Sequence, residues 1–246
     1  MHIPFTVRQC RSHEDLKLCV ELQRRIWWYG DEDLVPAAIF VVAQHTGGHA
    51  LCAFDGSTPA GFALAFSAEQ DGSRYWHSHM AGVLPEYQNR GAGRLLKLCQ
   101  REEALRAGVD RIQWTFDPLE LRNAYFNICR LGVAIRHYIP NCYGRTTSPL
   151  HGDLPTDRAL AEWRLSSARV AAAARNEAPP QPGLDLIKIP ISANIAELKR
   201  ADPSQACQWQ AGLRRRLQDL FSRGYAITGF ERGSDTCHYL LERYAD

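Results

Sequence analysis

The chain has 246 residues, of which 45% are hydrophobic and 23% are charged, the balance of an ordinary globular protein. This length gives one to two domains and excludes a mini-protein that needs disulfides or a metal to fold. The net charge is only +2, from 29 basic and 27 acidic residues that are interspersed, so the sequence predicts no nucleic-acid partner. No apolar run approaches the roughly 18 residues of a spanning helix, and the N-terminus lacks a secretion-signal pattern. We therefore expect no membrane partner and a cytoplasmic location.

Eight cysteines are scattered singly along the chain, without a C-x-x-C pair or a Cys/His cluster at zinc spacing. We expect reduced thiols that behave as small buried hydrophobes. The sequence therefore predicts no metal site and no cysteine nucleophile.

The first third of the chain predicts a strand, two helices and then an antiparallel meander. Ser12, with Asp15 three residues later, is a capping pair that opens the first helix, and Pro36 fits the start of the second. The expected elements lie at residues 5–9, 13–27, 37–44, 50–54, 60–67 and 76–83.

The middle of the chain predicts a helix, a strand, a second helix and a final pair of strands. Gly108 and Gly132 are placed to end the two helices. On the first helix, Leu95, Leu98, Cys99 and Leu105 fall mostly on one side. The expected elements lie at residues 94–107, 111–116, 121–130, 133–143 and 158–165, with a long polar loop between the last two.

The C-terminal part predicts a separate small unit. An Ala-rich helix at 168–175 is followed by the best linker candidate in the chain, 176–183, which contains three prolines. Beyond it we expect a strand at 184–191, a helix at 202–222 with Arg214 to Arg216 on a solvated face, and a closing hairpin. The predicted domains are therefore residues 1–175 and 184–246.

The segment from Leu84 to Gly93 joins a strand to a helix and has two glycines at its tightest point. Glycine removes Cβ atoms from the approach face, so main-chain N–H groups of the loop and of the first helical turn can converge on an anion. The helix dipole and the basic residues Arg90, Arg94 and Lys97 add positive charge. The spacing fits neither the dinucleotide fingerprint nor a P-loop.

Gln88-x-x-Gly91-x-Gly93 after a strand ending at Val83, together with the order of the other elements, resembles the acetyl-CoA-binding core of the GNAT superfamily of N-acetyltransferases. Residues 3 to about 166 can be laid onto that fold. The resemblance implies an α/β (α+β) fold with a mixed, mostly antiparallel central sheet flanked by helices, to which a small C-terminal α/β unit is added. Phrases such as Ser78-His79-Met80 are similar to a GNAT-like group whose substrate is unassigned.

The same resemblance implies where acetyl-CoA, or another acyl-CoA, would bind as co-substrate. The main chain near Ala81 and Val83 would pair with the pantetheine arm as if it were an extra strand. The pyrophosphate would be wrapped by the loop and the helix start, namely Gln88, Asn89, Arg90, Gly91, Ala92, Gly93 and Arg94. The implied chemistry is direct attack of a neutral amine on the thioester carbonyl, assisted by a base and an acid.

The sequence departs from the family at the acid. The position that commonly carries the thiolate-protonating tyrosine is Ile128, and the common cofactor-binding asparagine position is Leu121. Tyr125 lies off that register but stays a candidate acid, against the alternative that it packs on the sheet. Asn127 lies beside Ile128 and is a candidate hydrogen-bond donor to the cofactor, although an asparagine cannot act as an acid.

For the base, strand parity places His77 and His79 on one face with Ala81 and Val83. His77 occupies the place where related enzymes often carry a carboxylate. Either histidine can remove a proton near neutral pH, and the alternatives are two structural histidines or a metal pair.

Two further groups are candidates for the acceptor side. Asp117 and Glu120 could recognise a cationic amine, although Asp-Pro also simply ends strands. Trp27, Trp28 and Tyr29 could line an acceptor pocket, although adjacent aromatics at a helix end are more often core.

These observations favour an acyl-CoA-dependent N-acyltransferase that acts on the amine of a small molecule or amino acid. The alternatives are a catalytically silent GNAT-fold module that binds acyl-CoA or docks a partner, and a protein that has kept the fold only. The sequence names neither the acceptor nor the oligomeric state, for which a homodimer is one option.

Overall fold

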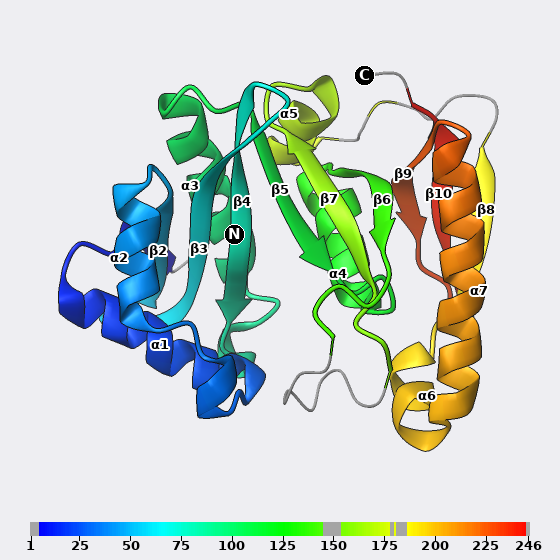
Figure 1. The fold of residues 1–246 in the computed structure, drawn as a ribbon, viewed down its shortest axis with the longest axis horizontal. Helices are drawn as coiled ribbons and strands as arrows, with labels where there is room; N and C mark the ends of the chain where they lie inside the picture. The colour runs from blue at the N-terminus through cyan, green and yellow to red at the C-terminus, as the bar shows by residue number, and fades with distance from the viewer. Residues whose placement is uncertain (1–4, 145–153, 178–179, 181–185, 245–246) are drawn as a thin grey trace. The chain divides into compact units, whose positions relative to one another are not determined.

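A computed structural model describes residues 5–144, 154–177, 180 and 186–244, and it forms two compact units (Figure 1). The first unit holds the described residues up to Gln113, and the second holds those from Trp114 onward. The middle of the polar loop predicted after residue 143, and most of the linker predicted at 176–183, lie outside the described residues. The domain division predicted at that linker stays a prediction.

The elements of the first unit follow the predicted order. They are β1 (Phe5–Gln9), α1 (His13–Trp27), the short helix η1 (Asp31–Asp33), α2 (Ala37–His45), β2 (His49–Asp55), β3 (Thr58–Gln70), β4 (Ser73–Val83), η2 (Pro85–Tyr87), α3 (Ala92–Arg106) and the beginning of β5 (Arg111–Phe116).

The second unit begins within β5 and contains one helix that the sequence analysis missed, α6. Its elements are α4 (Leu121–Tyr125), the π-helical turn η3 (Phe126–Arg130), β6 (Ala134–Ile139), β7 (Arg158–Arg164), α5 (Ala168–Ala174), β8 (Ile187–Ser192), α6 (Ile195–Ala201), α7 (Pro203–Ser222), β9 (Tyr225–Glu231) and β10 (Thr236–Arg243). None of the helices in the described ranges has the length and apolar character needed to cross a membrane.

The start of α1 confirms the predicted capping pair. The Asp15 N–H donates to Ser12 Oγ at 3.1 Å, and the Ser12 N–H donates to Asp15 Oδ2 at 3.2 Å, which is a complete capping box. Arg8 of β1 also donates to both oxygens of Asp15, at 2.9 and 2.7 Å. The cap therefore joins the helix to the first strand.

The sheet of the first unit has the order β1-β2-β3-β4-β5. The first three pairings are antiparallel, and β4 pairs with β5 in parallel at Trp76 and His77. β3 and β4 are longer than predicted because they continue to a two-residue turn at Asp71 and Gly72. Both turn residues have positive φ, 51° and 71°, as the twist of a tight hairpin requires.

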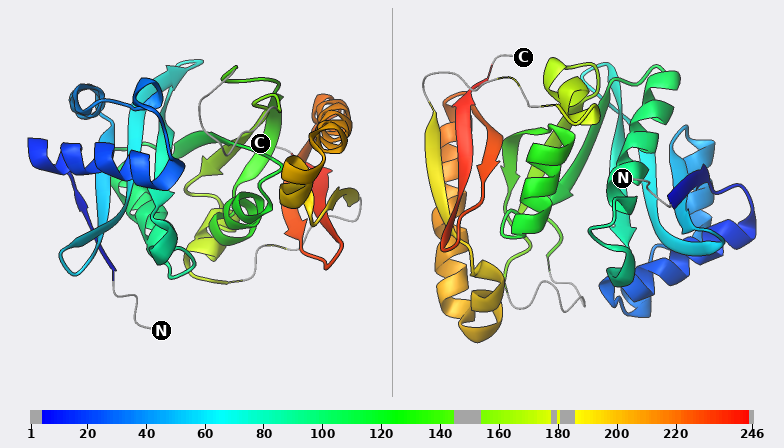
Figure 2. Two further views of the ribbon diagram at one scale, coloured as in Figure 1. Left: turned by 90° about the horizontal axis from the view of Figure 1, so that it is seen from below. Right: turned by 180° about the vertical axis from the view of Figure 1, so that it is seen from behind.

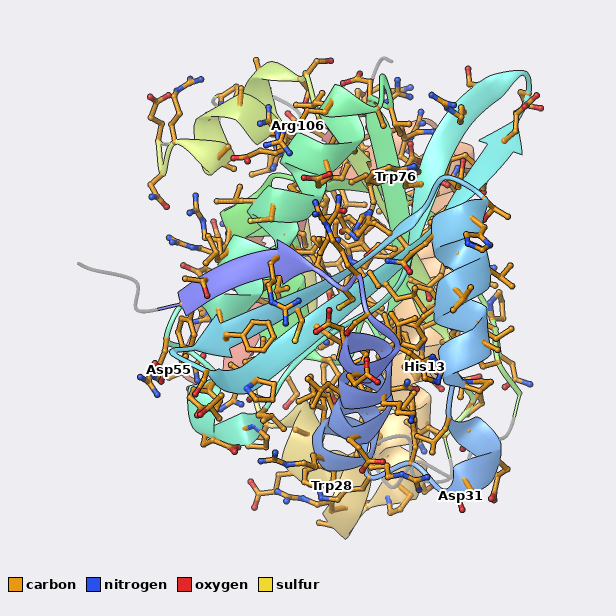
Figure 3. All side chains as sticks on the ribbon, turned by 90° about the vertical axis from the view of Figure 1, so that its left-hand side faces the viewer. His13, Trp28, Asp31, Asp55, Trp76 and Arg106 are labelled. Atoms are coloured by element: carbon orange, nitrogen blue, oxygen red, sulfur yellow. The ribbon has the colours of Figure 1, made fainter. Side chains whose placement is uncertain are left out.

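Helices cover both faces of this sheet (Figure 2). On one face, α1 and α2 bury a cluster that includes Leu22, Phe40 and Phe62. On the other face, Leu96 of α3 packs on small side chains such as Ala53 and Ala63. Figure 3 looks onto the first of these helices, between His13 at the start of α1 and Trp28 after its end.

In the second unit the strand order is β7-β6-β9-β10-β8, and the pairings are antiparallel. β9 and β10 form the predicted closing hairpin. Figure 2 (right) shows α4 on the near side of these strands and α7 on the far side. The mixed, mostly antiparallel fold class is thus confirmed.

All eight cysteines fall within the described residues and are free thiols, as predicted. Cys10, Cys19, Cys52 and Cys237 are buried, whereas Cys207 is exposed. Cys10 Sγ and Cys19 Sγ lie 3.6 Å apart, beyond the length of a disulfide bond.

A buried carboxylate, Asp157, ties α7 to the β6–β7 region. It accepts from Tyr138 Oη at 2.6 Å, from the Asn141 N–H at 3.0 Å and from two nitrogens of Arg214 at 2.8 Å each. The prediction that Arg214 lies on a solvated face was therefore wrong, whereas Arg215 and Arg216 are exposed. Asp157, the partner of Arg214, lies 57 residues away in the sequence, so helical periodicity could not reveal the ion pair.

We predict that Asp157→Asn lowers the free energy of unfolding by about 2 kcal/mol, because a neutral amide at this buried position removes the charge that pairs with the partly exposed Arg214 guanidinium and accepts from Tyr138. Urea denaturation followed by circular dichroism measures this change. Asp219→Asn is the matched control, because Asp219 pairs with Arg223 at 3.3 Å on the exposed face of the same helix and should change stability by less than about 1 kcal/mol. Equal effects of the two substitutions would contradict the assignment.

Candidate functional site

The loop between β4 and α3 is a tight, internally held turn. After Val83 the chain makes the short helix η2, and Gln88 Nε2 then donates to the Val83 carbonyl at 3.1 Å, closing the loop on itself. Asn89 and Gly91 follow with positive φ, 59° and 97°. This left-handed geometry turns the chain into the start of α3 at Ala92.

The N-terminus of α3 has the character of an anion-binding helix end. Its N-cap residue is Gly91, which has no side chain to accept hydrogen bonds from the first turn, and that turn contains no acidic residue. The leading N–H groups of a helix point along its axis and carry partial positive charge. The first turn of α3 therefore suits a phosphate group.

The structure requires glycine at position 91 of the motif but not at position 93. Gly91 is required by its backbone, because φ of 97° is strained for any residue with a Cβ. Gly93 has no positive φ, and a Cβ built there would meet only Val83 Cγ2, at an ordinary 3.6 Å. Packing within the described chain thus gives no reason for glycine at 93, although glycine in a helix costs about 0.5–1 kcal/mol relative to alanine.

The three basic residues near the loop have different surroundings. Arg90 lies 3.5 Å from Asp55 and stacks over the rings of Phe5 and Tyr87. Arg94 is half-buried in the first turn of α3. Lys97 is buried beneath the helix, so the expectation that it supplies charge at the loop was wrong.

Lys97 belongs to a buried polar cluster between α3, β2 and β4. Its Nζ donates to Ser78 Oγ at 3.2 Å and to Gln100 Oε1 at 2.5 Å. Gln100 Nε2 lies 3.1 Å from His49 Nε2, and the His49 ring is 4.5 Å from that of Trp76. His49 Nδ1 and Trp76 Nε1 have no hydrogen-bond partner among the described residues.

This cluster also corrects the predicted face of α3. The residues that are buried are Leu96, Lys97, Gln100 and Ala104, with Ala92, whereas Leu105 is 38% exposed. The helix faces the sheet with a lysine and a glutamine because β2 and β4 present polar partners there. A search for apolar spacing alone cannot find such a face.

Burial controls the ionisation of the cluster. Burial, with a smaller contribution from the nearby Lys97 charge, lowers the pKa of His49 to about 3. It also lowers the pKa of Lys97 well below the usual lysine value. Both groups are thus held toward their neutral forms.

One extra residue in β4 decides which way its side chains face. Met80 pairs with Leu64 but Ser78 pairs with Ala65, so His79 is a bulge without a partner in β3. Ser78 faces α3 through Lys97, whereas Met80 packs in the α1–α2 cluster. The alternation of faces is therefore inverted at the bulge.

His77 and His79 consequently lie together on the α1–α2 face. Their ring centroids are 6.2 Å apart, and the His79 ring is 5.6 Å from that of Phe66, which packs against the α1–α2 cluster. Val83 packs instead on Leu96 and Ala92 of the α3 side. The prediction that His77 and His79 share a face with Ala81 and Val83 was therefore wrong.

The two histidines are held toward the neutral form. Desolvation lowers the pKa of His77 below the usual histidine value, and the charges of His79 and Lys97 lower it further. Desolvation also lowers the pKa of His79, whose side chain is the more exposed of the two. Within the described residues, no group of three or more His, Cys, Asp or Glu side chains is placed to hold a metal ion.

The main chain of β4 beyond His77 is placed to accept another partner. Within the first unit, Ser78 and residues 80–83 pair with β3 alone, because the parallel pairing with β5 covers Trp76 and His77. Ala81 and Val83, which the resemblance assigns to the pantetheine arm, are in this stretch.

Tyr125 and Asn127 belong to the second unit. The Arg232 guanidinium stacks over the Tyr125 ring at 3.6 Å, and Asn127 is buried. Helix α4 ends at Tyr125, and Ile128 is buried within the π-helical turn that follows. The regular α-helical spacing that would put Tyr125 out of register therefore does not hold here.

Two other candidate groups have partners within their own units. Asp117 and Glu120 accept from Lys199 Nζ at 2.7 and 3.2 Å, so an ammonium of the chain itself occupies the carboxylates predicted to recognise an amine. Trp27 stacks on Tyr29 at 5.7 Å and packs with the α1–α2 core, whereas Trp28 is 58% exposed.

Comparison with known proteins matches part of the chain to a family. Residues 13–126, a little under half of the chain, match the model of the Acetyltransferase (GNAT) family. The matching segment runs from the start of α1 to the end of α4, and the family consists of acetyltransferases that use acetyl-CoA as co-substrate and acetylate amines. No curated protein matched the sequence.

Solved structures share the fold. The ribosomal-protein-S18-alanine N-acetyltransferase of Escherichia coli is 18% identical, with a TM-score of 0.53, and covers 67% of this chain and 96% of its own. The Salmonella typhimurium protein yncA, solved with its cofactor acetyl-CoA, is 18% identical, with a TM-score of 0.51 over 67% and 95% of the chains. Aminoglycoside 6'-acetyltransferase type Ii is also 18% identical, with a TM-score of 0.51 over 66% and 98%. About a third of this chain thus lies beyond each neighbour.

We predict that protonation of His49 destabilises the fold in acid. The unfolded chain takes up a proton at this residue near pH 6.5, whereas the folded chain does so only near pH 3. The free energy of unfolding should therefore fall as the pH drops from about 6.5 toward 3, by at most about 1.4 kcal/mol per pH unit from this group. Urea denaturation between these values measures the slope.

His49→Gln should flatten this dependence, whereas His45→Gln, at the exposed end of α2, should leave it unchanged. An identical slope in wild type and His49→Gln would show that His49 does not stay neutral in the folded protein.

Proposed function

We propose that the chain is an acyl-CoA-dependent N-acyltransferase, with acetyl-CoA as the donor, that transfers the acyl group to the amine of a small molecule or amino acid by direct attack. The match of residues 13–126 to the acetyltransferase (GNAT) family supports the class of reaction and the donor. The amine acceptor is inferred from the same family relationship. The geometry of the loop after β4, and of β4 itself, gives further support.

The observation that carries the proposal is Gly93. A Cβ at residue 93 would meet only Val83 Cγ2, at an ordinary 3.6 Å, so packing within the protein does not require glycine there. We infer that the missing side chain leaves room for a ligand. Gly91 directs the backbone into the helix, and the first turn of α3 offers partial positive charge. A pyrophosphate fits this arrangement of bare backbone and helix N-terminus.

Each residue then has a defined task. The N–H groups of the loop and of the first turn of α3 would hold the pyrophosphate, and the main chain at Ala81 and Val83 would hold the pantetheine arm. Because the Arg90 guanidinium lies beside Asp55, we assign its contribution to the main chain. The pyrophosphate set is Gln88, Asn89, Arg90, Gly91, Ala92, Gly93 and Arg94.

The proton transfers are assigned to three side chains. Acetyl-CoA supplies the activated acyl group when it is bound. His77 or His79 would remove the proton from the acceptor ammonium, since both are held toward the neutral form that a base requires. Tyr125 would protonate the leaving thiolate, and Asn127 would donate a hydrogen bond to the cofactor.

A second candidate is a catalytically silent module that binds acyl-CoA, which Ile128 and Leu121 favour because they replace the usual tyrosine and asparagine. Release of free thiol from acetyl-CoA across a panel of amines separates the two. Tight binding of acetyl-CoA without release for any amine would favour the silent module.

We predict that Gly93→Ala weakens acetyl-CoA binding by roughly tenfold or more, about 1.4 kcal/mol, because the new methyl occupies the approach face. The same substitution should raise stability by about 0.5–1 kcal/mol through helix propensity. Gly212→Ala is the matched control, because a Cβ in the middle of α7 meets nothing within 4 Å. That variant should gain stability and leave binding unchanged. If calorimetric titration finds the same affinity for acetyl-CoA in Gly93→Ala and wild type, the assignment of the loop to the pyrophosphate is wrong.

We predict that one of two substitutions, His77→Gln or His79→Gln, lowers the rate of acetyl transfer by about 10²-fold, the usual contribution of a general base. In the wild type, kcat/KM should rise through an ionisation below pH 6.5, because both pKa values are lowered. The inactive variant should lose this ionisation. If both variants keep the wild-type rate and pH profile, neither histidine is the base.

A further inference from the structure

Gln113 of β5 is a buried polar residue that has no task in the proposed reaction. The residue is only 6% exposed, and its side-chain amide has no hydrogen-bond partner in the described part of the chain. Neither amide atom is completely enclosed by the protein. A buried amide without a partner costs free energy unless another molecule supplies the hydrogen bonds. The Gln113 amide is therefore available to a ligand.

The pairing of β4 with β5 places Gln113 beside the candidate base. His77 and Gln113 are partners in this parallel pair, and so are Trp76 and Ile112. Partnered residues on neighbouring strands lie about 4.8 Å apart and point to the same face of the sheet. Trp76 contacts His49 on the α3 side, so His77 and Gln113 both lie on the α1–α2 side. A group that binds one of these two side chains is within reach of the other.

The charged groups around this pair are basic. His79 and Lys97 act on the ionisation of His77, and among the residues that the structure describes no carboxylate adds to them. On the face of β5 that carries Gln113, the Arg111 guanidinium stacks over the Tyr75 ring at 4.8 Å. These surroundings do not stabilise an ammonium, whereas an uncharged amine enters without this penalty.

A neutral amide suits an amine that must give up its proton. The oxygen of a glutamine accepts a hydrogen bond from the amine and thereby fixes its direction. A carboxylate would do the same, but its charge would favour the ammonium and the imidazolium over their neutral forms. Gln113 therefore orients an amine without opposing its deprotonation.

We propose that Gln113 Oε1 accepts a hydrogen bond from the acceptor amine beside His77, and that this site takes a weakly basic amine with a substantial uncharged fraction near neutral pH. The inference rests on the proposed acyltransferase function, and it selects His77 rather than His79 as the base. The amine nitrogen bonds to the acyl carbon as the C–S bond breaks, the amine proton passes to His77, and the thiolate takes the proton of the acid. Gln113 gives up no proton.

The first test measures thiol release from acetyl-CoA by the wild type at pH 7 with two sets of amines. Glycinamide and Nε-acetyl-L-lysinamide offer α-amines with an ordinary pKa of about 8, whereas Nα-acetyl-L-lysinamide offers an ε-amine with an ordinary pKa of about 10.4. The kcat/KM of the better α-amine should exceed that of the ε-amine by about tenfold or more, because far more of it is uncharged. Equal values or the reverse order would overturn the acceptor class. No thiol release with any amine would overturn the acyltransferase function itself, so the two failures are distinguishable.

The second test uses variants of Gln113 with the amine that the wild type acetylates fastest. Gln113→Leu should raise the KM of that amine by about tenfold and leave the KM of acetyl-CoA unchanged, because one hydrogen bond to the amine is lost. Gln113→Glu should move the ionisation in the pH profile of kcat/KM to higher pH, because the new carboxylate favours protonated His77. A change in folding alone would not produce this shift.

Gln70→Glu is the matched control, because Gln70 is exposed at the end of β3 in the same sheet. It should change neither the KM of the amine nor the pH profile. If the folded Gln113 variants also keep the wild-type KM and pH profile while the wild type is active, the assignment of Gln113 is wrong.

Discussion

The side chains of β4 pack on both faces of the sheet, and its end beyond His77 has a main-chain edge that pairs with no other strand of the first unit than β3. A single extra residue in the strand allows both arrangements. The bulge at His79 lets Ser78 face the buried lysine of α3, while Met80 and the two histidines face α1 and α2. Without the bulge, the alternation of the strand would place Met80 and Ser78 on the same face. The positions of the candidate base and of the main chain proposed to hold the pantetheine arm both depend on this irregularity.

The buried polar cluster between α3 and the sheet links α3 to β4 and to β2. Lys97 joins the helix to β4 through Ser78, and Gln100 joins it to β2 through His49. Hydrogen bonds between buried polar groups favour one arrangement of the side chains, and in this cluster they link three elements even though His49 Nδ1 and Trp76 Nε1 have no partner among the described residues. We interpret the cluster as the element that holds the start of α3, and thus the glycine loop, in a defined position relative to the sheet.

Much of this fold follows from local sequence signals. The bounds predicted for β1 and the approximate bounds predicted for α1 are confirmed, because the capping pair Ser12 and Asp15 and the spacing of apolar residues agree. The glycine loop was predicted from its motif. The bulge was not, because the sequence around His79 continues the alternation expected of a regular strand. The buried face of α3 was wrong, because Lys97 and Gln100 are buried by partners that only the tertiary structure brings together.

The contacts of the C-terminal third were equally hidden from the sequence. Lys199 meets Asp117 across 82 residues, and Tyr239 Oη donates to the Pro118 carbonyl across 121 residues at 2.5 Å. Together with Arg232 on Tyr125, these contacts fix the segment that links β5 to α4. The C-terminal part of the chain is therefore integrated with the other elements of the second unit, and through Arg232 it contacts the residue proposed as the acid.

The central claim, that the glycine loop and the start of α3 hold a pyrophosphate, is tested most directly by main-chain amide chemical shifts recorded during titration. With acetyl-CoA, the amides of residues 88–94 and of residues 81–83 should both shift. With acetyl-pantetheine, which lacks the pyrophosphate, residues 81–83 should still respond and residues 88–94 should not. The account would be contradicted if the amides of residues 88–94 did not shift with acetyl-CoA, or if they shifted equally with acetyl-pantetheine.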